Sequence, residues 1–248
     1  LLAFLDHHGM LTVFGSPTWR TVTGGSARYV EAITARLPSV RLGVPVRTVA
    51  RNSDGVLVRD DADRAEQFDA AVIATHPNQA LSILDQPTAD EIEILGALRY
   101  SINHTVLHTD TSLLPRRRGA RASWNYRMPS CTVQSDEVLV SYDLNRLQRL
   151  DGSTDRRFVV TLGGGTRVDP GQVIATMLYD HPQYSPEFRA AQQLLHTLGD
   201  HRVAFAGAYH GWGFHEDGAV SGVVAAERLG GSWSGAVPPL LRPAGNVA

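Results

Sequence analysis

The sequence predicts a mixed α/β fold in two parts, one combining helices with short strands and one built mainly of antiparallel strands. Three observations support this prediction: apolar residues at helical spacing near both ends of the 248-residue chain, a hairpin pattern around residues 46–60, and a series of strand-like segments between residues 100 and 162. Hydrophobic residues make up 43% and charged residues 19% of the chain. Those values are typical of a globular protein with a buried core and exclude a disordered segment.

The first predicted element is a helix that follows a glycine pair. Residues 23–26 read TGGS, and the segment SARYVEAITARL follows with Ser26 as its expected N-cap. Its apolar side chains recur at helical spacing and predict an amphipathic helix: Tyr29, Val30, Ile33 and Leu37.

Three short strands are expected next, at residues 40–51, 56–61 and 68–75. The turn sequence Asn52-Ser53-Asp54-Gly55 joins the first two as a hairpin. Residues 70–74 are apolar without alternation, which predicts a strand covered on both faces.

A helix is expected after Pro77, which should end the third strand. The segment TADEIEILGALR, residues 88–99, places Ile92, Leu95 and Leu98 on one face. We therefore expect that face to be buried.

The second part should contain a largely antiparallel sheet. Its strand candidates are residues 102–110, 121–126, 137–144 and 158–162. The chain should then return to the first part through a helix at 186–199, a buried strand at 202–207 and a final helix from about Asp217 to Leu229, with residues 231–248 as a Gly/Pro-rich tail.

Composition excludes several classes of function. The net charge is −2, and the longest run of like charge is Arg116-Arg117-Arg118, so we expect no nucleic-acid partner. No lysine occurs, which excludes a Schiff-base mechanism in this segment, and the single Cys131 excludes an internal disulfide. No apolar stretch reaches the roughly 18 residues needed to span a bilayer. We expect a soluble cytoplasmic protein with a small-molecule substrate; its oligomeric state is left open. The opening LLAFLDHHGMLTV reads like the interior of a domain, so we also expect a preceding segment.

The segment from Phe205 to Gly222 carries the most chemical information. It reads as a buried strand ending in glycine, a loop of glycines and aromatic residues, and a helix whose first turn contains Asp217, Gly218 and Ala219. Unpaired N–H groups at a helix N-terminus suit an anion or an electron-rich ligand edge, and glycine allows close approach of the backbone. A tight, purely structural connection explains the spacing equally well.

This segment resembles the C-terminal FAD signature of flavin-containing amine oxidases, with its F-A-G strand, aromatic loop and E-G-A helix start. The resemblance implies that Gly207 lies against the cofactor and that the helix start at Gly218 and Ala219 faces the pyrimidine edge of the flavin. Phe214 stands where many members have a tyrosine on the substrate side. The other cofactor-binding candidates of this segment are Ala208, Trp212, Gly213 and Glu216.

Two further blocks resemble the family in the correct order. Gly24-Gly25 with its helix matches the glycine pair, and Val46 falls where relatives contact the adenine side of the cofactor. Ala74 and Thr75 match a strand end near the dinucleotide. SINHTVLHT is similar to a strand that often bears a lysine near flavin N5, and His104 occupies that position. The resemblance covers roughly residues 21–229 and is nearest to a bacterial branch of NAD/FAD-binding proteins.

The sequence also departs from the family pattern. Ala208 stands where an acidic residue is common, and the pair Glu216-Asp217 is one residue longer than the simple E-G-A start. The G-x-G-x-x-G turn that binds the cofactor's pyrophosphate is absent from the sequence.

The resemblance implies an FAD-dependent oxidoreductase of amine oxidase type with an incomplete, discontinuous Rossmann-like FAD-binding domain, residues 21–80 and 200–230, and an antiparallel substrate domain, residues 81–199. Its reaction would be hydride transfer from an amine or lipid-like substrate to flavin N5, with His104 as the catalytic candidate. Two alternatives stay open. One is a non-catalytic fragment unable to hold FAD alone, and the other is a flavin-dependent desaturase or isomerase of lipids or isoprenoids.

Weaker candidates have structural explanations. The histidines lack a metal-ligand pattern such as HExxH, so no metal is expected. Gly163-Gly164-Gly165 lacks the residues that complete a P-loop, and neither Ser26 nor Ser221 lies in a G-x-S-x-G elbow. A few polar and aromatic residues of the second part either line a substrate pocket or serve packing: Trp124, Asn125, Tyr126, Asn145 and Arg146.

Overall fold

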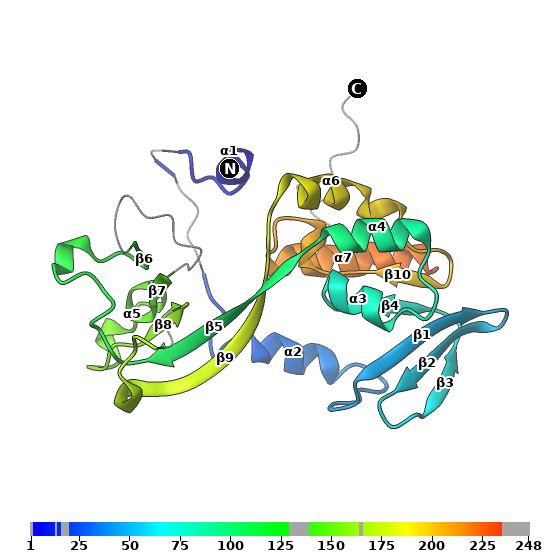
Figure 1. The fold of residues 1–248 in the computed structure, drawn as a ribbon, viewed down its shortest axis with the longest axis horizontal. Coiled ribbons are helices and arrows are strands. Elements are labelled where there is room, and N and C mark those ends of the chain that lie inside the picture. The colour runs from blue at the N-terminus through cyan, green and yellow to red at the C-terminus, as the bar shows by residue number, and fades with distance from the viewer. Residues whose placement is uncertain (1, 13, 16–19, 129–138, 164–165, 235–248) are drawn as a thin grey trace. The chain divides into compact units, whose positions relative to one another are not determined.

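The computed structural model describes residues 2–12, 14–15, 20–128, 139–163 and 166–234 (Figure 1). The chain divides into two compact units, residues 1–99 with 183–248 and residues 100–182. The second unit is shorter than the substrate domain predicted from the sequence, because residues 81–99 and 183–199 belong to the first unit. The fold is mixed α/β, as predicted.

A pair of parallel strands lies in the first unit. Strand β4 (Ala71–Ile73) pairs with β10 (Val203–Phe205), although 129 residues lie between the end of β4 and the start of β10. The hydrophobic core joins these strands to the helices of the unit, with Leu95, Phe188 and Val203 fully or almost fully buried. Three described helices of this unit contribute to the core: α3 (Pro77–Ile83), α4 (Ala89–Ala97) and α6 (Pro186–Leu194). Helix α7 (His215–Arg228) packs on β10 through a second, smaller hydrophobic cluster.

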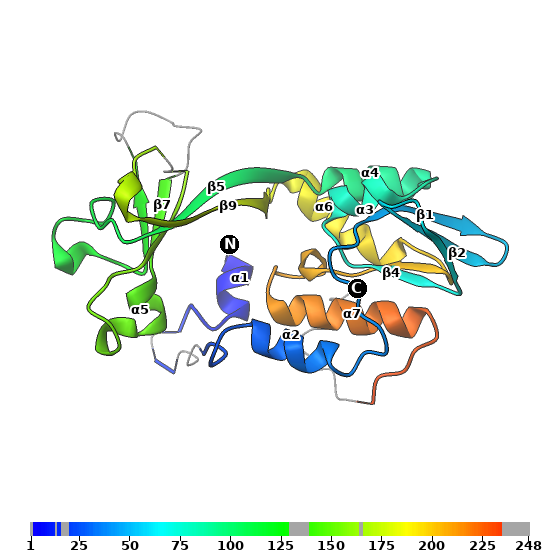
Figure 2. The same cartoon turned by 90° about the horizontal axis from the view of Figure 1, so that it is seen from below.

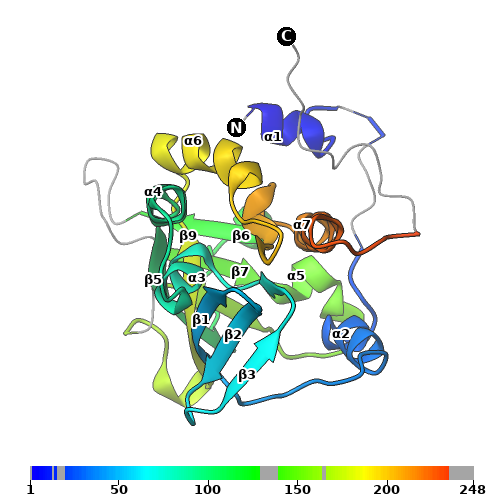
Figure 3. The ribbon, with the colours of Figure 1, turned by 90° about the vertical axis from the view of Figure 1, so that its right-hand side faces the viewer.

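The predicted hairpin is confirmed and gains a third strand. Strands β1 (Val46–Asn52) and β2 (Gly55–Asp60) are antiparallel, and β3 (Ala65–Phe68), which the sequence pattern did not predict, pairs with β2 (Figure 3). Gly55 has φ +141°, and a Cβ there would lie 2.1 Å from the carbonyl oxygen of Phe68. Only glycine fits this turn.

Helix α2 (Ala27–Thr34) occupies the predicted place but does not bury its apolar face. Val30 is 49% and Ile33 58% exposed. Ser26 directly precedes the helix, yet its side chain makes no capping hydrogen bond, so the predicted N-cap interaction is wrong. The reason is that Ser26 itself has helical backbone angles, whereas a capping residue needs an extended conformation to reach the free N–H groups.

Two details near Pro77 also differ from the prediction. Pro77 begins helix α3, where its missing N–H costs nothing, in addition to ending the strand. In α4, Ile92 is 53% exposed and Ile94 is buried beside Leu95. The core contacts α4 on a face shifted from the one that the spacing predicted.

Strand β4 is not covered on both faces. Ile73 is buried in the core, whereas Val72 is 41% exposed. Val72 pairs with Ala204 in the parallel register, so both side chains lie on the same face of the two-stranded sheet. On that face, Ala204 packs against Ala225 of α7. This helix covers β10 and leaves Val72 accessible.

The second unit consists mainly of a five-stranded antiparallel sheet of order β6-β7-β8-β5-β9. The predicted strands are all present, but the longest strand, β9, was not predicted from the sequence. Its aspartate, its histidine and the proline at its end obscured the pattern. The strands are β5 (Tyr100–His108), β6 (Trp124–Arg127), β7 (Leu139–Asp143), β8 (Val159–Leu162) and β9 (Val173–Pro182).

The remaining elements are short. Helix α1 (Leu2–His7) belongs to the first unit and α5 (Leu144–Gln148) to the second. Single 3-10 turns occur at Arg118–Ala120, Leu150–Gly152, Pro170–Gln172, Leu195–Thr197 and Ala208–His210. Among the described residues, no helix has the length and hydrophobicity that crossing a membrane requires.

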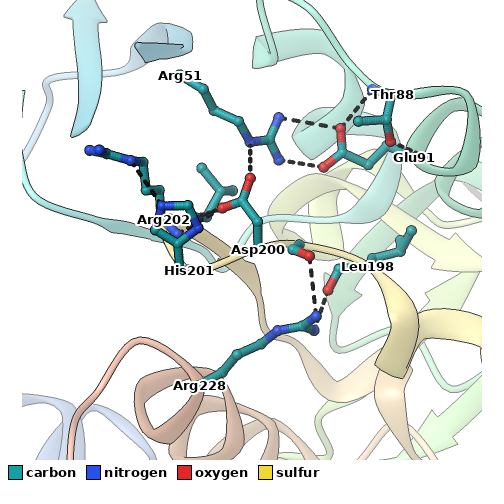
Figure 4. Close-up of polar contacts among 10 residues, drawn as sticks. Arg51, Thr88, Glu91, Leu198, Asp200, His201, Arg202 and Arg228 are labelled. Atoms are coloured by element: carbon teal, nitrogen blue, oxygen red, sulfur yellow. Dashed lines mark hydrogen bonds and ion pairs between the residues drawn. The ribbon is translucent and has the colours of Figure 1, made fainter. Parts of the chain in front are cut away.

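A group of charged side chains joins distant segments of the first unit (Figure 4). Arg51 of β1 contacts Glu91 of α4 and lies 3.0 Å from a carboxylate oxygen of Asp200. Arg228, at the end of α7, donates to the carbonyl oxygens of Leu198 and Gly199. These contacts fix the turn that leads into β10.

Candidate functional site

The carboxyl ends of the two parallel strands lie side by side. The N–H of Ala206 donates to the carbonyl oxygen of Ile73 at 3.0 Å, so the residues that follow β4 and β10 start from one edge of the sheet. These residues are Ala74 and Thr75, which are exposed, and Gly207. Ligands of α/β proteins bind outside the carboxyl ends of parallel strands. The structure therefore brings three of the predicted cofactor-binding residues to one edge.

Ser221 connects this edge to helix α7. Its hydroxyl accepts from the N–H of Gly207 at 2.8 Å and donates to the carbonyl oxygen of Gly218 at 2.7 Å. A Cβ on Gly207 would lie 2.3 Å from the ring of Tyr209, so the close turn after β10 requires glycine. Ser221 is buried and acts as a structural link, a role that its sequence context did not indicate.

The first turn of α7 is partly capped by the protein. The carboxylate of Asp217 accepts from the N–H of Phe214 at 2.9 Å. Within the described part of the chain, no hydrogen bond from the N–H of His215 or Glu216 to a protein acceptor is present. A Cβ on Gly218 would lie 3.7 Å from the backbone nitrogen of Ala208, an ordinary packing distance, so Ala208 flanks this glycine. Two helix N–H groups thus remain able to donate to a ligand.

Helix α6 holds the loop between β10 and α7. The buried side chain of Gln192 donates to the carbonyl oxygens of Tyr209 at 2.8 Å and Gly211 at 2.6 Å. The guanidinium of Arg189, one turn earlier, lies over the ring of Trp212 at 5.4 Å from its centre. Neither residue was predicted to belong to the site, because the sequence of α6 indicated only a helix.

Aromatic contacts connect the same loop to α1. The ring of Phe4 stacks on Phe214 with centres 6.0 Å apart, and it meets Trp212 edge-on at 5.7 Å. The ring of His8 lies 4.7 Å from that of Phe214. In this structure, Trp212 and Phe214 therefore contact protein side chains of α1, although Phe214 remains 37% exposed.

Two titratable side chains of the loop region are perturbed by burial. Burial lowers the pKa of His210 to about 4, which keeps its imidazole neutral at neutral pH. Burial, together with the charge of Asp217, raises the pKa of Tyr184. A Cβ on Gly213 would lie 2.9 Å from the hydroxyl oxygen of Tyr184, and Gly213 has φ +92°. Both the packing and the backbone conformation therefore favour glycine at this position.

The glycine pair at residues 24 and 25 lies at the start of α2. Both glycines have positive φ, and Gly25 donates its N–H to the carbonyl oxygen of Val22. One turn further along, the hydroxyl of Tyr29 is 3.0 Å from Nδ1 of His215, the first residue of α7. This contact joins the helix that follows the glycine pair to the first residue of α7. Figure 2 shows α2 beside α7.

Other predicted site residues lie outside this group. Val46 starts β1 and pairs with Asp60, and no hydrogen bond or ring contact among the described residues joins it to the α7 N-terminus. His104 lies on β5 of the second unit, opposite Leu178, with an exposed side chain. Ala219 follows Gly218 within α7.

The weaker candidates have structural roles or fall outside the described residues. Asn145 is buried and binds the backbone of Arg156 and Phe158. Asn125 is buried in the sheet, and Arg146 is exposed. In the described ranges, no group of three or more His, Cys, Asp or Glu side chains is arranged to hold a metal. Cys131, Gly164, Gly165 and most of the predicted tail lie outside the described residues.

Comparison with known proteins agrees with this geometry. The family model for flavin containing amine oxidoreductase matches residues 1–230. No curated protein matches the chain.

One solved structure supports the fold similarity, and a second aligns with a lower score. A triple mutant of putrescine oxidase, redesigned in its cofactor binding, aligns with a TM-score of 0.53 and 17% identity over 82% of this chain and 52% of its own. A CLA-producing fatty acid isomerase from P. acnes aligns with a TM-score of 0.46 and 16% identity over 74% of this chain and 47% of its own. The chain thus spans about half the length of these solved proteins.

Proposed function

The chain belongs to the flavin-containing amine oxidoreductase family, and on that premise we propose that it contributes the surface that binds the isoalloxazine end of FAD in an oxidoreductase. The first unit would hold the cofactor and the second would contact a small-molecule substrate. FAD, when bound, supplies a two-electron acceptor for a hydride from a substrate C–N or C–C bond.

One observation carries the proposal. The strand β10, the glycine loop and helix α7 converge at the carboxyl edge of the parallel pair, where the N–H groups of His215 and Glu216 have no acceptor among the described residues. Such N–H groups, at the positive end of a 14-residue helix, stabilise an electron-rich ring edge. The absence of a side chain on Gly218 lets the ring approach the backbone.

The surrounding residues keep this surface in place. Gln192 holds the loop through two carbonyl oxygens, and Ser221 holds the turn after β10 against α7. Preorganised donors of this kind favour charge on a bound group because they need no rearrangement. Asp217 contributes by fixing the entry of the helix rather than by contacting the cofactor, since its carboxylate is bonded to the N–H of Phe214.

His104 is the proposed catalytic residue of the second unit. An imidazole can hydrogen-bond to water and can accept or donate a proton, which suits general acid–base catalysis. Its role would be to bind a water molecule or move a proton next to the reacting bond.

A matched pair of glycine variants tests the proposed flavin surface. The chain is titrated with FAD and with riboflavin, which carries the isoalloxazine ring without the pyrophosphate, and binding is followed by quenching of flavin fluorescence. We expect both to bind and Gly218→Ala to weaken binding at least tenfold, because the added methyl group separates the ring from the backbone.

The control is Gly222→Ala, one turn later on the same helix, where a Cβ meets no atom within 4 Å. Both variants gain similar helix propensity, about 1 kcal/mol, so a difference in binding reports the contact itself. If neither flavin binds, or if the two variants bind equally well, this chain does not form the proposed surface and the alternative of a fragment that cannot hold FAD is favoured.

A further inference from the structure

The residue that follows helix α1 is a histidine whose two ring nitrogens have different surroundings. Nδ1 of His8 lies 2.8 Å from the carbonyl oxygen of Phe4. A carbonyl oxygen can only accept, so Nδ1 carries the hydrogen atom and donates it. In the neutral imidazole, Nε2 then has a free lone pair and acts as an acceptor. Within the described part of the chain, no protein group donates to Nε2 of His8.

His8 lies beside the residue that precedes helix α7. Its ring centre is 4.7 Å from that of Phe214 and 4.5 Å from that of Phe4. Phe214 is the N-cap residue of α7 and is followed by His215 and Glu216, whose N–H groups have no acceptor among the described residues. The imidazole is half-buried, so it remains accessible to a ligand. A free acceptor is therefore held next to the two free donors of the proposed flavin surface.

The pyrimidine edge of an isoalloxazine ring needs both kinds of partner. It carries two carbonyl oxygens, which accept hydrogen bonds, and between them the N3–H group, which donates one. The first turn of α7 offers only donors, and the positive end of the helix dipole disfavours a ligand donor. An unpaired donor in a bound ring costs roughly 1–3 kcal/mol. A ring that binds at α7 therefore requires an acceptor from another element.

We propose that Nε2 of His8 accepts the hydrogen bond from flavin N3–H. This inference rests on the proposed flavin surface and adds a cofactor-binding residue to it. The imidazole is fixed twice, by the hydrogen bond to the carbonyl oxygen of Phe4 and by ring contacts with Phe4 and Phe214. A side chain that is already held in place loses little conformational entropy when the ligand binds.

The other acceptors near the start of α7 are less suitable. The carboxylate of Asp217 already accepts from the N–H of Phe214. Nδ1 of His215 lies 3.0 Å from the hydroxyl of Tyr29. The side chain of Glu216 is exposed to water, and its negative charge would repel the negative charge of a reduced flavin. A neutral imidazole accepts the hydrogen bond without this repulsion.

Two flavins that differ only at N3 test the proposal. Riboflavin has the N3–H group, and 3-methylriboflavin carries a methyl group in place of the hydrogen atom. Each is titrated into the chain, and binding is followed by quenching of flavin fluorescence. We expect the wild-type chain to bind 3-methylriboflavin at least about tenfold more weakly than riboflavin, because the hydrogen bond is lost and the methyl group meets the imidazole.

Two variants of His8 separate the hydrogen bond from ring packing. His8→Ala removes the acceptor and makes room for the methyl group, so the preference for riboflavin should fall below about threefold. His8→Phe keeps a ring against Phe4 and Phe214 but has no acceptor, so it should bind riboflavin at least about fivefold more weakly than the wild type. Thermal unfolding of each variant verifies that the fold is retained, and either folded variant by itself tests the proposal.

His196→Ala is the matched control. Nδ1 of His196 makes the same kind of hydrogen bond, at 2.8 Å to the carbonyl oxygen of Gln193. The backbone of His196 contacts Arg228 at the far end of the 14-residue helix α7, roughly 20 Å from its first turn. We expect this variant to bind both flavins as the wild type does.

Four results would each overturn the proposal: equal binding of the two flavins by the wild type, a preference for riboflavin that persists in His8→Ala, an unchanged riboflavin affinity in His8→Phe, or equal losses in His196→Ala. A failure of the proposed function gives a different result. If riboflavin does not bind at all, the flavin surface is absent and this inference falls with it. If Gly218→Ala weakens riboflavin binding and the His8 variants do not, the flavin surface stands and His8 is not part of it.

Discussion

The carboxylate of Glu91 is 2% exposed and forms a two-point ion pair with the guanidinium of Arg51, although the two lie 40 positions apart in the sequence. The same carboxylate accepts from the N–H of Thr88 at 2.9 Å and so caps α4. Arg51 also lies 3.0 Å from Asp200, in the turn that leads into β10. Arg51 thus connects the hairpin sheet both to α4, through Glu91, and to the turn that leads into β10, through Asp200 (Figure 4).

We predict that Glu91→Ala strongly destabilises the protein. The change leaves the guanidinium of Arg51 without its main counter-charge and removes the cap of α4, which should lower the free energy of unfolding by about 3–5 kcal/mol. The control is Glu31→Ala, which breaks the exposed pair of Glu31 with Arg28 and should cost at most about 0.5 kcal/mol. Urea unfolding measures both, and similar losses in the two variants would contradict a special role for Glu91.

A second prediction concerns the loop between β10 and α7. Gln192→Ala removes two hydrogen bonds to loop carbonyl oxygens and should lower the free energy of unfolding by about 1–3 kcal/mol. It should also weaken riboflavin binding, since the loop would no longer be fixed. Gln193→Ala, at the exposed neighbouring position, should change neither quantity. An unchanged riboflavin affinity in Gln192→Ala would show that the loop does not contribute to the flavin surface.

A third prediction concerns acid stability. Burial lowers the pKa of His210 to about 4. The unfolded chain binds a proton at this imidazole near pH 6.5, whereas the folded chain resists protonation until about pH 4. The stabilisation by neutral His210 is therefore complete above pH 6.5 and is lost as the pH falls from 6.5 to 4, with a slope of up to about 1.4 kcal/mol per pH unit.

Burial also lowers the pKa of His108, which adds to the slope in the same direction. We expect His210→Phe, which keeps a ring next to Tyr209, to reduce the slope measured by urea unfolding between pH 7 and 5. The aspartates with lowered pKa, among them Asp60 and Asp110, lose their contribution only as the pH falls below about 4. A slope unchanged in His210→Phe would contradict the assignment.

A fourth prediction concerns the proposed catalytic residue. In the flavin-loaded protein, His104→Ala should slow reoxidation of the reduced flavin by oxygen at least tenfold, because a positioned proton donor contributes about a hundredfold or more. His104→Gln should restore part of the rate if the side chain acts by hydrogen bonding to water. His201→Ala, at an exposed position of the first unit, is the control. Stopped-flow absorbance gives the rates, and unchanged rates in His104→Ala would remove His104 from the mechanism.

Local patterns predicted those elements whose signal lies within a few neighbouring residues. The hairpin turn at Asn52–Gly55 follows from turn chemistry, and α7 follows from helical spacing after a glycine-rich loop. Strand β9 was missed because its polar residues do not alternate with its apolar residues, and only its pairing with β5 makes it a strand. Ile92 was assigned to the core in error, because spacing defines a helical face but not which part of that face meets other elements.

The sequence by itself determined the family, the mixed α/β class and the segment from Phe205 to Gly222 as the centre of interest, since these depend on residue types in a fixed order. Only the tertiary structure decided which distant groups meet: Ile73 with Ala206 at the strand ends, and Gln192 with the loop carbonyl oxygens. The physical reason is that the positions of such contacts follow from pairing and packing between segments far apart in the chain.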